Sequence, residues 1–127
     1  MIAAEYYFVI ADYNKADAQI KNCEEKIMAN YGKLHLTYVE ILLKKAVIRA
    51  KMKQYEAKDI LPIFDLALKI VFDCIGDKAA FYHEIKIKQA EYLISINQLS
   101  KSNEILNEEQ KYALQFKKAN KIGRAHV

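Results

Sequence analysis

The 127-residue chain has 53% hydrophobic and 28% charged residues, the balance of one globular domain, which excludes an intrinsically disordered protein. Its formal net charge of +4 is spread along the chain, and all but two of its 20 basic residues are lysines. We therefore expect no nucleic-acid interface, because such interfaces concentrate charge and favour arginine. Three glycines and one proline are few for a sheet protein, and the apolar residues recur at helical spacing, so we predict an all-α fold.

Six helices are predicted along the chain. They cover residues 2–11, 14–29, 34–54, 59–75, 79–97 and 100–119. Gly32 and Gly76 are expected to end the second and fourth helices, because glycine accepts a left-handed backbone at little steric cost. Asp59 is expected to cap the fourth helix, which places Pro62 in its first turn, and Ser100 is expected to cap the sixth.

An internal repeat relates the two ends of the chain. A step of 86 residues carries Ala4 onto Ala90 and pairs small residues with small ones and large apolar residues with large apolar ones. The further pairs are Tyr7 with Leu93, Phe8 with Ile94, Ile10 with Ile96, Tyr13 with Leu99, Ala16 with Ser102, Ile20 with Leu106 and Met28 with Leu114. A middle copy places Ala46 42 residues after Ala4 and 44 before Ala90, so an insertion of two residues is expected between Tyr55 and Ile60. A period of this size predicts three stacked antiparallel helical hairpins.

The first copy carries the pattern of a known repeat. In "AEYYFVIADYNKADAQIKNC" the matching residues are Ala4, Tyr7, Asp12, Tyr13, Ala16, Ile20 and Cys23. The third copy keeps Ala90, Leu93, Leu99, Ser102 and Leu106. Over nearly all of residues 1–119 the chain resembles the tetratricopeptide-repeat family, in the bacterial signalling type whose repeats exceed 40 residues. The resemblance implies an α-α superhelix of right-handed twist, in which the first helix of each pair lines a concave groove.

The groove positions of that family fall on the first helix of each copy. In the first copy they correspond to Glu5 and Val9. In the later copies they give the candidate partner-binding residues Glu40, Lys44, Val47, Lys51, Glu84, Lys88, Glu91 and Ser95. Glu and Lys four residues apart also stabilise an ordinary surface helix, so these charges have a structural interpretation as well. If Lys44, Lys51 and Lys88 form a basic stripe, an acidic peptide is the expected ligand; otherwise the apolar Val47 and Ile94 are the better candidates.

Patterns that indicate catalysis or metal binding are missing from the sequence. Cys23 and Cys74 have no CxxC spacing, and we expect both to be packed, reduced thiols. His83–Glu84 lacks the second histidine of a metalloprotease motif. With no Ser-His-Asp spacing and no phosphate-binding glycine loop, we predict no enzyme activity, no cofactor and no metal.

Both ends of the sequence bear on localisation and extent. The N-terminal "MIAAEYYFVIADY" lacks a basic region and contains Glu5, unlike a signal peptide, and no apolar run reaches membrane-spanning length. We therefore expect a cytoplasmic protein. The last six residues, "IGRAHV", match the translation of a common sequencing adapter. We interpret residues 1–121 as a repeat domain cut from a longer chain and residues 122–127 as a non-native tail.

Two functions from different classes fit this domain. The first is a non-catalytic scaffold that binds a protein or peptide in the groove. The alternative is the sensory, regulatory segment of a bacterial transcription regulator or histidine kinase whose output domain lies outside this sequence. A helix-turn-helix or kinase domain in the flanking gene sequence would favour the alternative.

Overall fold

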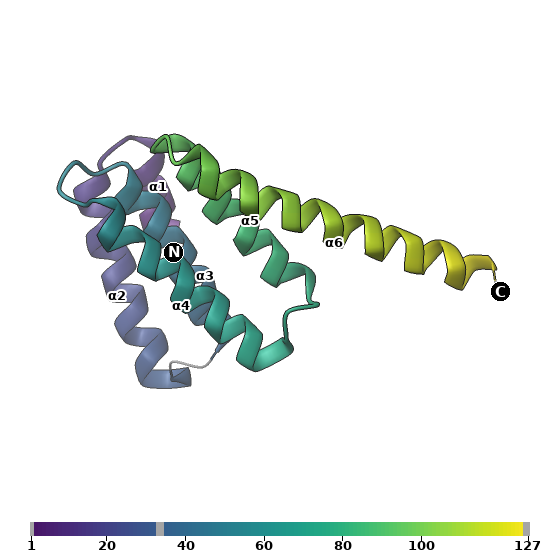
Figure 1. Cartoon of the computed structure of the whole chain (residues 1–127). Coiled ribbons are helices and arrows are strands. Elements are labelled where there is room, and N and C mark those ends of the chain that lie inside the picture. Colours follow the sequence, from purple (N-terminus) through teal and green to yellow (C-terminus); the bar gives the residue numbers. More distant parts are fainter. Residues whose placement is uncertain (1, 33–34, 126–127) are drawn as a thin grey trace. The chain divides into compact units, whose positions relative to one another are not determined.

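The computed structural model describes residues 2–32 and 35–125, and within those ranges every regular element is a helix (Figure 1). The helices are α1 Ile2–Val9, α2 Tyr13–Tyr31, α3 Leu36–Ala50, α4 Ala57–Ile75, α5 Ala80–Ser95 and α6 Leu99–Ala125. α1 packs on α2, α2 on α3, and α3 on α4. The all-α prediction and the arrangement as successive helical hairpins are confirmed.

The chain divides into two compact units, Met1–Ile85 and Lys86–Val127. The first unit contains a cluster of buried residues from α1, α2, α3 and the connection after α3: Ala4, Ala16, Ile20, Ile41, Ile48 and Met52. Ala4 and Ala16 are at most 1% exposed, as expected for small residues where two helices cross. In the second unit their repeat equivalents Ala90 and Ser102 are buried to the same degree, and the Ser102 hydroxyl donates to the Ala90 carbonyl at 3.1 Å.

The turn between α1 and α2 has the geometry of a Schellman motif. The Asp12 N–H donates to the Tyr7 carbonyl at 2.8 Å, and the Ala11 N–H donates to the Phe8 carbonyl at 3.0 Å. Ala11 has a φ of 61°, the left-handed conformation that this motif requires. Asp12 then caps α2, since its side chain accepts a hydrogen bond from the Lys15 N–H.

The same turn recurs between α5 and α6, at the 86-residue step. The Gln98 N–H donates to the Leu93 carbonyl at 2.8 Å and the Asn97 N–H to the Ile94 carbonyl at 3.0 Å. Asn97, the equivalent of Ala11, has a φ of 62°. The repeat that the sequence predicts between the first and third copies therefore extends to the backbone hydrogen bonds.

The middle hairpin has a longer connection, residues 51–56, where the other two have three residues each. It is three residues longer than the other two connections, one more than the predicted insertion, because α3 ends one residue before the equivalent of Val9, the last residue of α1. α3 ends at Ala50 and not at residue 54, because the amides of Lys51 and Met52 turn back to the carbonyls of Ile48 and Arg49. The three connections, residues 10–12, 51–56 and 96–98, each overlap the gap left between the two predicted helices of a hairpin, and each begins two to four residues earlier than expected.

Three predictions about helix starts are wrong in detail. α4 begins two residues earlier than expected, with Glu56 as its N-cap, and the Asp59 carboxylate accepts from the Glu56 N–H at 2.9 Å from inside the helix. Pro62 therefore lies in the second turn of α4 and not in the first. Ser100 is the second residue of α6, which begins at Leu99, so Ser100 is not its N-cap.

At the other ends of the helices, the prediction that glycines end α2 and α4 is confirmed. Gly32 and Gly76 follow α2 and α4 with φ of 79° and 85°. Their ψ values of 179° and 171° place them in an extended region that essentially only glycine occupies, and not in the left-handed helical region that we expected. Leu34, the expected start of the third helix, lies outside the described residues, as do the last two residues of the expected tail. α6 runs to Ala125, six residues past its predicted end.

Candidate functional site

Four of the predicted groove residues lie along one face of α3 and its C-terminal cap, Lys51. Glu40, Lys44, Val47 and Lys51 follow the spacing of a single helix face, and all four are exposed or partly exposed. The Val47 side chain, 42% exposed, is the apolar member of this set. We call Glu40, Lys44, Val47 and Lys51 the α3 stripe. It lies entirely within the first unit.

A salt bridge joins the α3 stripe to α1. The Lys44 Nζ lies 2.8 Å from the Glu5 Oε1, and both side chains are partly exposed. The hydrogen bond from Lys44, together with its positive charge, lowers the pKa of Glu5 below the usual value of 4.5. The contact brings together the groove positions of the first and second copies, and it neutralises one of the three lysines of the expected basic stripe.

The other four predicted groove residues lie on α5. Glu84, Lys88, Glu91 and Ser95 repeat the spacing of the α3 stripe, and all four are exposed. Glu84 belongs to the first unit, and the other three belong to the second. The Ser95 hydroxyl donates to the Tyr92 carbonyl of its own helix.

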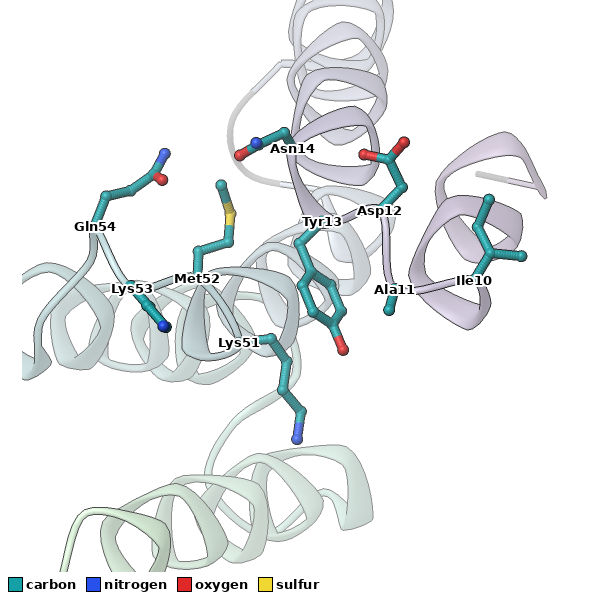
Figure 2. Close-up of a pocket in the computed structure, with 9 residues that line it drawn as sticks. All are labelled: Ile10, Ala11, Asp12, Tyr13, Asn14, Lys51, Met52, Lys53 and Gln54. Atoms are coloured by element: carbon teal, nitrogen blue, oxygen red, sulfur yellow. The ribbon is translucent and has the colours of Figure 1, made fainter.

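An open pocket lies where the α3 stripe ends. It has a volume of about 530 Å³ and is lined by residues 10–14, from the α1–α2 turn and the start of α2, and by residues 51–54, which follow α3 (Figure 2). Lys51 belongs to both the pocket and the α3 stripe. The remaining lining is mixed: Ile10 and Met52 are apolar, whereas Asn14 and Gln54 offer amide groups. A pocket of this composition can hold a side chain with an apolar body and a polar end.

A buried charge network supports the pocket from within the first unit. Asp17, only 4% exposed, accepts from the Arg49 Nε at 3.1 Å and from the Tyr55 hydroxyl at 3.3 Å. The Arg49 guanidinium also stacks over the Tyr55 ring, 4.5 Å from its centroid. Arg49 and Tyr55 flank the pocket-lining segment 51–54, so this network fixes both ends of that segment. Sequence reasoning missed it, although Asp17 is next to Ala16 and three residues before Ile20, on the side of α2 that the repeat predicts to be buried.

A second polar cluster joins α2 to α3. The Tyr38 hydroxyl donates to the Glu24 Oε1 at 3.2 Å, and the Lys45 Nζ lies 3.1 Å from the Glu24 Oε2. Burial of the phenol, followed by the negative charge of Glu24, raises the pKa of Tyr38 to about 12. The cluster has the character of a structural contact, since Tyr38 is 5% exposed.

The two cysteines differ from each other. Neither is in a disulfide; Cys23 is partly buried against the α1–α3 cluster, whereas Cys74 on α4 is exposed, so the expectation of a packed thiol is wrong for Cys74. Within residues 2–32 and 35–125, His, Cys, Asp and Glu side chains do not gather in groups of three that could hold a metal ion. No helix among the described residues is long and apolar enough to cross a bilayer.

Comparisons with known proteins add no relative. The chain matches no family model, no curated protein and no solved structure.

Proposed function

We propose that this chain is a non-catalytic helical repeat scaffold that binds a peptide or protein segment along the α3 stripe and into the pocket at its end. The proposal rests on one observation: the predicted groove residues of the first two copies form a continuous exposed surface that ends in a pocket. Exposed positions on the first helices of two successive copies meet at the Glu5–Lys44 salt bridge, and the same stripe enters a pocket of about 530 Å³ through Lys51. The recurring hairpin turn and the tetratricopeptide-like pattern both support a stacked array with such a surface.

The chemistry of the surface suggests a ligand that is mostly apolar with one acidic group. Val9 is 81% exposed and Val47 is 42% exposed, so each can receive an apolar side chain. Because Glu5 neutralises Lys44, the acidic group would pair with Lys51. The proposed ligand therefore carries a single acidic group, unlike the uniformly acidic peptide expected for a basic stripe. Because only one charge pair forms, the affinity should depend weakly on salt concentration.

A selection from a displayed peptide library, followed by affinity measurements with the full chain, tests this function. Val47→Asp and Lys51→Glu should each weaken the selected peptide by about tenfold or more, the loss of one well-packed contact. The matched control is Lys69→Glu, an equal charge reversal at an exposed position of α4. Equal affinity for the three variants and the unmodified chain would reject the α3 stripe as the site. Lys44→Glu is a poor probe, because it would place two carboxylates in the present salt bridge.

We also propose a cellular location. We place the scaffold in the cytoplasm, because two cysteines that form no disulfide fit a reducing compartment.

A further inference from the structure

The first helix carries an apolar face that its own hairpin leaves uncovered. Ile2, Tyr6 and Val9 follow one side of α1, and Ile10 continues it directly after the helix; their exposed fractions are 86%, 60%, 81% and 52%. Large apolar residues at such spacing on a surface helix normally face a partner. The internal repeat indicates what kind of partner fits.

The equivalents of two of these residues in the middle copy are buried. A step of 42 residues, the one that carries Ala4 onto Ala46, carries Tyr6 onto Ile48 and Ile10 onto Met52. Ile48 and Met52 are 4% and 7% exposed, and both belong to the cluster that packs them against the preceding hairpin. Tyr6 and Ile10 thus occupy the positions with which one hairpin docks on the hairpin before it. We call Tyr6 and Ile10 the leading face.

The complementary side of the same interface is open at the other end of the repeat. In the first hairpin, Tyr13 and Ile20 of α2 pack in the cluster that receives Ile48 and Met52. The 86-residue step carries Tyr13 and Ile20 onto Leu99 and Leu106 of α6. Ile20 is fully buried, but Leu99 and Leu106 are 55% and 36% exposed. We call Leu99 and Leu106 the trailing face.

We propose that copies of this chain associate head to tail, with the leading face of one copy packed on the trailing face of the next. The occupant is a second copy because the chain already contains both halves of one interface. Within the molecule, the two halves meet where α2 packs on α3. The trailing face is the repeat equivalent of the α2 side of this contact, and the leading face is the equivalent of the α3 side. Different patches meet in this contact, so it is heterologous and adds further copies, unlike a symmetric dimer that closes on itself.

Sedimentation velocity over protein concentrations from about 1 µM to about 1 mM tests the association, since contacts of this kind form within that range. The average mass of the unmodified chain should rise with concentration past that of two copies. Tyr6→Glu with Ile10→Glu should abolish the rise, and so should Leu99→Glu with Leu106→Glu. All four positions are exposed, so circular dichroism should show unchanged helix content. The control, Leu66→Glu with Ile75→Glu, makes the same change at two exposed residues of α4 and should still associate.

Mixing the two defective variants distinguishes the head-to-tail contact from other forms of self-association. The leading-face variant keeps an intact trailing face, and the trailing-face variant keeps an intact leading face. Their mixture should therefore form a one-to-one dimer that grows no further. An unmodified chain that stays monomeric throughout the range would overturn the proposal and leave the leading face to another segment or protein. Failure of the mixture to form the dimer would also overturn it.

Discussion

Ala11 and Asn97 occupy the same left-handed position of two equivalent turns, and they differ in how well they tolerate it. A left-handed conformation costs alanine roughly 1–2 kcal/mol, whereas asparagine visits it more readily. Ala11→Gly should therefore raise the free energy of unfolding by about 1 kcal/mol, and Asn97→Gly should raise it by less. Urea denaturation of the two variants measures both changes. A larger gain at Asn97 than at Ala11 would contradict this explanation of the turns.

Loss of the buried Asp17 carboxylate should strongly destabilise the fold. Asp17→Ala removes the partner of Arg49, whose side chain is only 14% exposed, and leaves its charge buried and unpaired. Breaking one side of a buried ion pair typically costs about 3–5 kcal/mol. Asp73→Ala, the same change at an exposed position of α4, should cost far less. Thermal or urea unfolding of the two variants measures the loss of unfolding free energy. Equal losses for Asp17→Ala and Asp73→Ala would mean that the buried network adds no specific stability.

Stability should depend on pH through Tyr38 at the alkaline end. The folded state raises the pKa of this phenol from 10.0 to about 12, so between these values the folded chain holds a proton that the unfolded chain releases. The contribution is fully present below pH 10 and is lost as the pH rises toward 12. Tyr38→Phe removes the titrating group, so its unfolding free energy should fall less over this range than that of the unmodified chain. Parallel decreases for the two proteins would exclude Tyr38 as the cause.

At the scale of helices, local sequence signals predicted where breaks occur better than which residue makes each cap. The six helices and the glycine ends were predictable because periodicity and positive φ are properties of single segments. The exact starts of α4 and α6 were not, because Glu56 and Asp59 together form the capping box of α4, with Asp59 at its third residue, and α6 begins one residue earlier than expected, at Leu99. The Asp17–Arg49 pair depends on how α2 meets α3, and the Glu5–Lys44 bridge on how α1 meets α3. Spacing along one helix does not contain that information.

The position of Pro62 inside α4 gives a prediction for this element. A proline in the second turn has no N–H to donate to the carbonyl of Lys58. In a helix interior the proline ring also crowds the carbonyl four residues before it. Pro62→Ala restores the donor at an exposed site and should stabilise the chain by about 1–3 kcal/mol. Pro62→Gly is the matched control: it also restores the donor but has low helix propensity, so it should stabilise less than alanine. A loss of stability with alanine would show that proline is needed for the entry into α4.

Over the whole molecule, buried residues are distributed unevenly. α3 and α4 each contribute seven buried residues. Ser102 is the only buried residue of α6 among those whose burial the structure describes. In a stack of repeats each hairpin is stabilised mainly by its neighbours, so helices covered on two sides open less often than those covered on one. Among the described residues, the leading and trailing faces lack such cover.

Native-state hydrogen exchange should therefore follow a gradient along the chain. Opening free energies run from near zero at poorly packed segments up to the global unfolding value in the core. We expect the slowest amides in α3 and α4, and faster exchange in α1 and in α6 beyond Leu106. At protein concentrations where copies associate, protection should increase specifically in α1 and α6 and stay unchanged in α3, because only the end helices gain a neighbour. Uniform protection of all six helices at low concentration would contradict the gradient. A concentration-dependent increase confined to α3 would contradict the placement of the leading and trailing faces.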